Sequence, residues 1–186
     1  MTPLLVIVAG YFAGAIPFGV ILAKRKGVDI RERGSGNIGA TNVARVIGLG
    51  SGLVVLALDA LKGAAAVWLA RELCGWEHIV ALTGFAAILG HCFSPFLGGK
   101  GGKGVATALG VFLAIAPVLA VVAIAVFLVV AGRTRVPALG SLSGIASATL
   151  YAFITGMTLD ISLLALATLA LLVYTHRGNL ARLVTS

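Results

Sequence analysis

The stretch VATALGVFLAIAPVLAVVAIAVFLVVAG (105–132) carries no charged side chain, and it decides how often this chain crosses a membrane. An apolar run of about 18 residues or more is typical of a transmembrane helix. As a single helix the run would be about 42 Å long, against a hydrocarbon core of about 30 Å. Pro117 lies near its middle and can end one helix and begin another. The run is therefore either one strongly tilted helix or two short ones.

The rest of the chain has the same character. Hydrophobic residues make up 60% of the 186 residues. Thr155, Gly156 and Asp160 interrupt the last long apolar stretch. The other apolar runs cover 3–23, 51–71, 78–97, 139–158 and 159–176. No linker or soluble segment intervenes, so we expect one all-α polytopic membrane domain over residues 1–186.

The basic residues indicate an orientation. The chain has 14 Lys and Arg residues against 6 Asp and Glu, and most of the basic ones lie in short loops at 24–45, 100–103, 133–135 and 177–182. Cytoplasmic loops of membrane proteins carry such an excess. All four clusters lie on one side only if 105–132 crosses twice. We therefore expect seven transmembrane helices, with the N-terminus outside and the C-terminus in the cytoplasm, and no nucleic-acid partner.

Two segments place polar, glycine-rich and basic sequence between the apolar runs. They are GSGNIGATNVAR (34–45) and GHCFSPFLGGKGGKGVAT (90–107). Glycine lets the backbone approach a ligand closely, and clustered N–H groups with Lys or Arg bind anions. Basic loop residues also contact anionic lipid headgroups, which better explains Lys24, Arg25 and Lys26. We interpret the two glycine-rich segments as phosphate-binding loops on the cytoplasmic side.

The first segment supplies hydroxyl, amide and guanidinium groups. A short helix there would direct Thr41, Asn42 and Arg45 to one side, since residues three and four apart are neighbours on a helix. Arg binds phosphate through two parallel hydrogen bonds and Lys binds it as a point charge. The candidate binding residues of the first segment are Ser35, Gly36, Asn37, Gly39, Thr41, Asn42 and Arg45. Those of the second are His91, Lys100, Gly101, Gly102, Lys103 and Gly104.

Other polar residues have two interpretations each. Asp59 and Lys62 lie three residues apart within an apolar run, and charges in a membrane need a partner or water. They form either an ion pair on one helix face or part of a polar cavity. His176 is either a cap at the C-terminal end of the last helix or a ligand of the site.

Several familiar sites are excluded by context. Gly34, Gly36 and Gly39 match a dinucleotide fingerprint, but no strand precedes them. Gly rather than Ser or Thr follows Lys103, so ATP hydrolysis is not expected. Two cysteines and three histidines form no metal-ligand pattern. We expect neither a metal nor another cofactor.

SGNIGATNVAR (35–45) and GHCFSPFLGGKGGKGVAT (90–107) resemble the two long signatures of PlsY-type bacterial acyl-phosphate:glycerol-3-phosphate acyltransferases. The resemblance extends to Asp59, Lys62 and Gly63, and to HRGNLARL at 176–183. It implies a seven-span inner-membrane enzyme that transfers a fatty acyl group from acyl phosphate to the 1-hydroxyl of glycerol 3-phosphate, giving lysophosphatidic acid and phosphate. The competing interpretation is a small transporter or channel with a phosphate-selective basic vestibule, but the chain shows no internal repeat.

The resemblance also implies site residues. It places Ser35, Asn42, Arg45, Lys103, His176 and Asn179 around the substrates, with Arg and Lys holding phosphate. Ala138 stands where a third signature usually has Ser, so Ser141 is a candidate for that contact, and Gly178 replaces a usual Glu.

The same resemblance, together with the residues present, suggests a mechanism and partners. The leaving phosphate is expected to take the hydroxyl proton, because no side-chain base is evident, and His91 and His176 are the side chains to test for that role. The candidate catalytic residues are Ser35, Arg45, Lys103 and His91. The expected partners are the two substrates, membrane lipid and the soluble enzyme that makes acyl phosphate.

The charge pattern makes a testable prediction about topology. We expect Lys100, Lys103, Arg133 and Arg135 to face the cytoplasm, and the region around Pro117 to face outward, because basic loops stay inside. Labelling of single cysteines introduced at these positions with a membrane-impermeant reagent checks this. Labelling of 100–103 and 133–135 from opposite faces would refute the double crossing.

Overall fold

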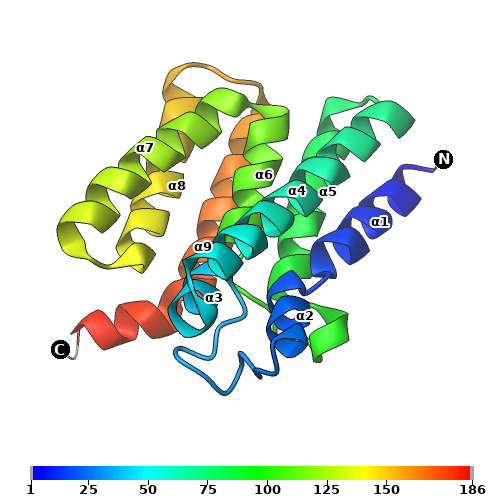
Figure 1. The fold of residues 1–186 in the computed structure, drawn as a ribbon. Helices are drawn as coiled ribbons and strands as arrows, with labels where there is room; N and C mark the ends of the chain where they lie inside the picture. The colour runs from blue at the N-terminus through cyan, green and yellow to red at the C-terminus, as the bar shows by residue number, and fades with distance from the viewer. Residues whose placement is uncertain (1, 185–186) are drawn as a thin grey trace.

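The computed structural model describes residues 2–184, and the side chains up to residue 181. This part of the chain contains helices and no strand. The helices are α1 (Pro3–Ala15), α2 (Phe18–Arg25), α3 (Ala40–Ile47), α4 (Leu49–Leu73), α5 (Glu77–Cys92), η1 (Pro95–Leu97), α6 (Val105–Ile115), α7 (Pro117–Thr134), α8 (Pro137–Ile154) and α9 (Leu159–Val184). They pack side by side, with the two termini at opposite ends of the bundle (Figure 1).

Six helical stretches among the described residues are long and apolar enough to cross a membrane. They correspond to α1 with α2, α4, α5 with η1, α7, α8 and α9. The shorter α6 is equally apolar but has only 11 residues. The expectation of an all-helical, multi-pass membrane protein is confirmed.

The apolar run 105–132 is two helices, as the charge pattern predicted. Helix α6 ends at Ala116, whose φ of −150° and ψ of 81° are not helical, and Pro117 begins α7. The two helices meet at the end of the bundle that lies away from the long loops (Figure 1). The second predicted break is also present, because α8 ends at Ile154 and α9 begins at Leu159.

The first apolar run differs from the expectation of one uninterrupted span. The helix breaks between α1 and α2 at Ile16 and Pro17. Proline lacks an N–H and cannot donate to the preceding turn. Side chains from elsewhere in the chain donate to carbonyl oxygens at this break: Ser94 Oγ to Ala15 O at 2.7 Å, and Lys62 Nζ to Ile16 O at 2.8 Å, which also accepts from the Phe18 N–H at 3.2 Å.

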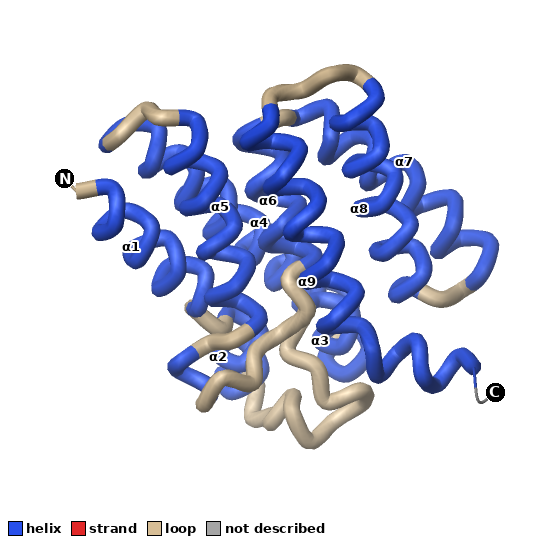
Figure 2. Tube along the Cα trace, turned by 180° about the vertical axis from the view of Figure 1, so that it is seen from behind, coloured by secondary structure: helices blue, strands red, loops and turns tan. Residues whose placement is uncertain are grey.

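Glycines let the central helices approach closely. A Cβ at Gly90 of α5 would overlap the Tyr11 carbonyl oxygen of α1, and one at Gly110 of α6 would overlap the Ala60 carbonyl oxygen of α4. Small residues of this kind are typical of helix interfaces in membranes, where close packing drives association. This packing positions α1, α4, α5 and α6 relative to one another. The loops 26–39 and 93–104 gather at one end of the bundle, beside α2 and α3 (Figure 2).

Candidate active site

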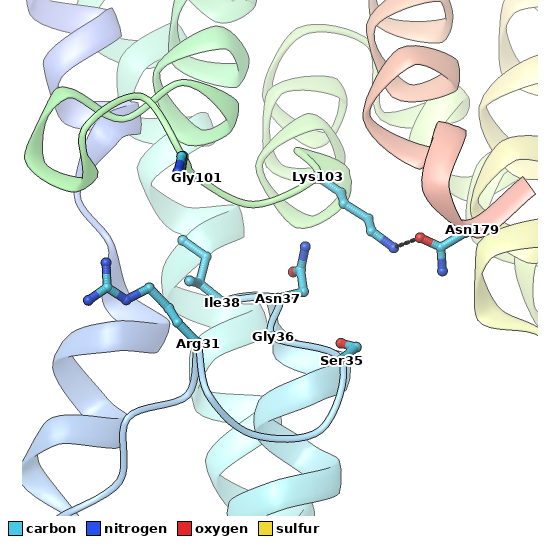
Figure 3. A pocket seen from close by; sticks show the side chains of 9 residues that line it. Arg31, Ser35, Gly36, Asn37, Ile38, Gly101, Lys103 and Asn179 are labelled. Carbon is cyan, nitrogen blue, oxygen red and sulfur yellow. Dashed lines mark hydrogen bonds between the residues drawn. The ribbon is translucent and has the colours of Figure 1, made fainter. Parts of the chain in front are cut away.

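A pocket of about 280 Å³ opens between these two loops and the C-terminal part of α9. Figure 3 shows Arg31 and Lys103 on opposite sides of it, with Asn37 between them and Ser35 below Lys103. The lining residues are Arg31, Ser35, Gly36, Asn37, Ile38, Lys100, Gly101, Lys103 and Asn179. Segments that are far apart in the sequence thus meet here, and most of their lining residues were candidates from the sequence.

Asn42 organises the first loop from below. Its side chain is 2% exposed. Asn42 Oδ1 accepts a hydrogen bond from the Ser35 N–H at 2.8 Å, and Asn42 Nδ2 donates to the carbonyl oxygens of Arg33 at 3.0 Å and Asn37 at 2.9 Å. A fourth contact reaches Ile30 O at 3.3 Å. These bonds hold Ser35 and Asn37 at the pocket.

The expectation that Asn42 points the same way as Thr41 and Arg45 is wrong. The short helix α3 exists as predicted, but Thr41 and Arg45 are exposed while Asn42 turns into the loop. Residues that are adjacent in sequence on a helix point in different directions. The Asn42 amide points inward because it donates to carbonyl oxygens of the loop. Asn42 therefore acts on the loop backbone.

Arg31 is a lining residue that the sequence analysis missed. Its backbone N–H donates to Asp29 Oδ1 at 3.0 Å, and its guanidinium lies 3.6 Å from the same oxygen. The backbone hydrogen bond from Arg31 is the main reason that the pKa of the Asp29 carboxyl lies below its usual range, and the Arg31 guanidinium lowers this pKa further. The Asp29 carboxylate thus holds Arg31 in place beside the pocket. The Asp-x-Arg spacing was the available signal.

The second loop folds back onto the end of α5. The N–H of Gly101 donates to Cys92 O and the N–H of Gly102 to His91 O, both at 3.0 Å. Gly104 has a φ of +88°, which favours glycine, and it precedes the first turn of α6. Because the Gly101 and Gly102 amides are already bonded, they do not form the anion-binding cluster expected from the sequence. The charge of this loop comes from lysine side chains.

Helix α9 holds Lys103 at two points. Lys103 Nζ donates to Asn179 Oδ1 (Figure 3), and Thr175 Oγ1 donates to Lys103 O at 3.1 Å. The ammonium group and the backbone carbonyl of Lys103 are thus each held by one residue of α9, and Lys103 lines the pocket. Thr175 was not a candidate in the sequence, where it precedes His176 without a motif of its own.

Other predicted site residues do not line this pocket. His176 is 2% exposed, and its Nδ1 lies 2.8 Å from Leu172 O. Since α9 continues to Val184, the interpretation of His176 as a C-terminal cap is wrong. Ser141 Oγ donates to Pro137 O within α8 at 3.0 Å. The candidates outside the lining are Gly39, Thr41, Asn42, Arg45, His91, Gly102, Gly104, Ser141 and His176.

The chemistry of the pocket favours a small anion. Arg31, Lys100 and Lys103 contribute positive charge, Ser35 and Asn37 contribute neutral polar groups, and no lining residue is acidic. Arg and Lys together recognise phosphate well. Among the described residues no group of His, Cys, Asp or Glu could hold a metal ion. The pocket can hold a phosphorylated headgroup at the loop end of the bundle.

Comparison with known proteins gives a consistent result. A family model described as glycerol-3-phosphate acyltransferase matches residues 4–186. The glycerol-3-phosphate acyltransferase of Myxococcus xanthus (strain DK1622) is 48% identical, over 98% of this chain and 96% of the relative. That of Aquifex aeolicus (strain VF5) is 41% identical, over 100% of this chain and 97% of the relative. A crystal structure of PlsY in its glycerol 3-phosphate form has a TM-score of 0.95 and 41% identity, covering 100% of this chain and 93% of that one.

The role of Asn42 can be tested without turnover. Asn42→Ala removes the bonds to the first loop, each worth about 0.5–1.5 kcal/mol. We expect backbone amide exchange at Ser35, the donor to Asn42 Oδ1, to rise by about 10-fold or more. Hydrogen–deuterium exchange measures this, with Thr41→Ala on the exposed side of α3 as the control. Equal exchange in both variants would contradict the role.

Proposed function

The chain belongs to the glycerol-3-phosphate acyltransferase family, and from that premise we propose that it transfers a fatty acyl group from acyl phosphate to the 1-hydroxyl of glycerol 3-phosphate. The products are lysophosphatidic acid and phosphate. The observation that carries this proposal is the cationic pocket between loops 26–39 and 93–104. Solved PlsY structures described as glycerol 3-phosphate and lysophosphatidic acid forms cover the whole of this chain.

The main task of such a site is to bring two anionic headgroups together. Lys100, Lys103 and Arg31 offset their mutual repulsion within the pocket. Holding the hydroxyl against the acyl carbonyl can supply about 7–11 kcal/mol of barrier lowering. The Gly101 and Gly102 amides are bonded to α5, so Lys103 is the group we assign to the charge that develops on the carbonyl oxygen.

We assign the proton to the leaving phosphate. As the new ester bond forms at the acyl carbon, the bond from that carbon to the phosphate oxygen breaks, and the hydroxyl proton passes to a phosphate oxygen. The two candidate histidines are poorly placed for the task. His91 is 4% exposed beneath the second loop, and His176 is 2% exposed inside α9. Neither lines the pocket.

The proposed topology has seven spans, with α6 as a short seventh crossing, an external N-terminus and a cytoplasmic site. The location is the bacterial inner membrane. Lys100, Lys103, Arg133 and Arg135 then belong to cytoplasmic loops, in agreement with the distribution of basic residues. In this arrangement glycerol 3-phosphate enters from the cytoplasm and the acyl tail lies between helices in the lipid. The soluble enzyme that makes acyl phosphate is a candidate partner.

Donor specificity is the first test of the proposal. The pocket holds about 280 Å³ and no aromatic side chain lines it, so adenine finds no stacking platform. We expect purified protein to convert labelled glycerol 3-phosphate with acyl phosphate as donor, in the absence of CoA, and not with acyl-CoA. Product can be followed by thin-layer chromatography of the lipid extract. Comparable rates with acyl-CoA would overturn the donor assignment, and no product with either donor would overturn the reaction.

Side-chain charge is the second test. Lys103→Ala should lower kcat by about 100-fold or more with a smaller change in KM, because charge at the reacting centre matters most in the transition state. Arg45 lies on the exposed side of α3 outside the pocket lining, and we retain the proposal that it binds the phosphate of glycerol 3-phosphate from there. Arg45→Lys keeps the charge but loses the two parallel hydrogen bonds of a guanidinium, so we expect KM for glycerol 3-phosphate to rise about 10-fold. Lys26→Ala, in the basic stretch after α2, is the matched control. Wild-type kinetics in either site variant would assign that residue to lipid headgroups instead.

A further inference from the structure

Three ionisable side chains from α4 and α5 meet inside the bundle, outside the pocket lining. Asp59 is 2% exposed, Lys62 6% and His91 4%. Lys62 Nζ lies 2.8 Å from Asp59 Oδ1, which confirms the ion pair among the two interpretations drawn from the sequence. His91 Nδ1 lies 3.7 Å from the same carboxylate oxygen. We call these three residues the buried cluster.

Stability alone is a poor explanation for the buried cluster. Removing charges from water is unfavourable, and a well-packed apolar replacement for a buried ion pair is often as stable or more stable. In a membrane span the same side chains are harder still to bury. A chain that needed only helix packing at this depth would use apolar residues. The reason for the cluster therefore lies in what its members contact.

Lys62 contacts the break in the first span. Its ammonium donates at 2.8 Å to Ile16 O, the carbonyl oxygen just before Pro17, which also accepts from the Phe18 N–H at 3.2 Å. The same ammonium lies 5.7 Å from the centre of the Phe18 ring, the first residue of α2. Lys62 thus fixes the junction between α1 and α2.

His91 contacts the second loop of the pocket. A Cβ at Gly102 would overlap His91 Nε2, so the Gly102 backbone lies directly on the imidazole. The Gly102 N–H donates to the carbonyl oxygen of His91 at 3.0 Å. The next residue is Lys103, whose side chain lines the pocket. The position of the imidazole therefore determines the position of Lys103 relative to the pocket.

The loop is also bound to the break itself. Ser94 Oγ donates to Ala15 O at 2.7 Å, and Tyr11 Oη donates to Phe93 O at 2.7 Å. The residues that begin the second loop thus rest on the end of α1, one residue away from the carbonyl held by Lys62. Polar contacts run from Ile16 through Lys62 to Asp59, and His91, 3.7 Å from that carboxylate, lies between Asp59 and Gly102.

We propose that Asp59, Lys62 and His91 are positioning residues that fix the Gly101–Gly104 segment, and with it the Lys103 ammonium, at the pocket. The inference rests on the proposed acyl transfer and extends it. It attributes the position of the phosphate site to buried residues that do not contact substrate. Asp59 pairs with Lys62 and lies 3.7 Å from His91 Nδ1, Lys62 holds the helix break, and His91 supports the loop.

The decisive comparison is between single and double neutral variants. Asp59→Asn alone and Lys62→Met alone each leave one buried charge unpaired, so both should lower the Tm. The double variant Asp59→Asn/Lys62→Met removes both charges and should recover most of that Tm. We expect its kcat to stay about 30-fold or more below wild type, with KM for glycerol 3-phosphate changed less than about 3-fold. Thr83→Val, a buried polar change elsewhere in α5, should leave kcat unchanged.

Recovery of kcat together with Tm in the double variant would overturn the proposal, because the pair would then serve stability alone. Failure of the wild-type protein to turn over acyl phosphate would instead count against the proposed reaction. A readout without turnover separates the two cases. Amide exchange at Gly101 and Gly102, which donate to Cys92 and His91, should rise about 10-fold or more in the double variant. Unchanged exchange at both amides would also overturn the proposal.

His91→Gln gives an independent variant if the double one does not fold. Glutamine retains a polar side chain beneath Gly102 but lacks the ring that supports it. We expect a Tm close to wild type, a lower kcat, and a pH profile of kcat with the same shape as wild type. Wild-type kcat would overturn the supporting role. Loss of one limb of the pH profile would identify His91 as a proton acceptor and would overturn it as well.

Discussion

A break in a membrane-spanning helix leaves carbonyl oxygens that the protein itself must satisfy, because lipid offers no hydrogen-bond donor. In this chain the break lies at Ile16 and Pro17, and the Ile16 carbonyl oxygen accepts from the Phe18 N–H at 3.2 Å and from Lys62 Nζ at 2.8 Å. The ammonium in turn requires Asp59, which lies next to His91. The first break in the helical bundle thus determines where charge is buried, and the buried charge lies beneath the second loop.

The same constraint explains why the site is at the end of the bundle. Backbone that is not helical is tolerated in a membrane protein only where protein or water satisfies it. Loops 26–39 and 93–104 meet this condition differently. The first is held by the side chain of Asn42, and the second by backbone bonds to the last residues of α5. Each loop is rigid for its own reason, and the cations project from fixed backbones.

Several features of the fold followed from the sequence. The split at Pro117 could be predicted because the side on which basic loops lie fixes the parity of crossings, and length alone left the matter open. The break at Ile16 was missed although Pro17 was a local signal for it; the contact with Lys62 could not be predicted, since that residue is distant in the sequence. For the same reason the sequence could show that Asp59 and Lys62 needed a partner, but not that His91 joins them.

The candidate site could be predicted from the sequence about as far as the fold. Glycine, lysine and asparagine in the two loops identified an anion site, and Ser35, Asn37 and Lys103 do line one pocket. The predicted direction of the Asn42 side chain was wrong because hydrogen bonds to loop carbonyl oxygens determine it. The sequence does not show where those carbonyl oxygens lie. Arg31 was missed because its place in the pocket depends on how residues 29–37 turn around Asn42.

The central claim is that the two loops together form a phosphate-binding pocket lined by Arg31, Lys100 and Lys103. A crystal structure of this protein with bound glycerol 3-phosphate tests it most directly. The account predicts phosphate density inside this pocket, with Gly102 still resting on His91. Phosphate bound at Lys24–Lys26 or elsewhere on the surface, with the pocket between the loops holding only solvent, would contradict it.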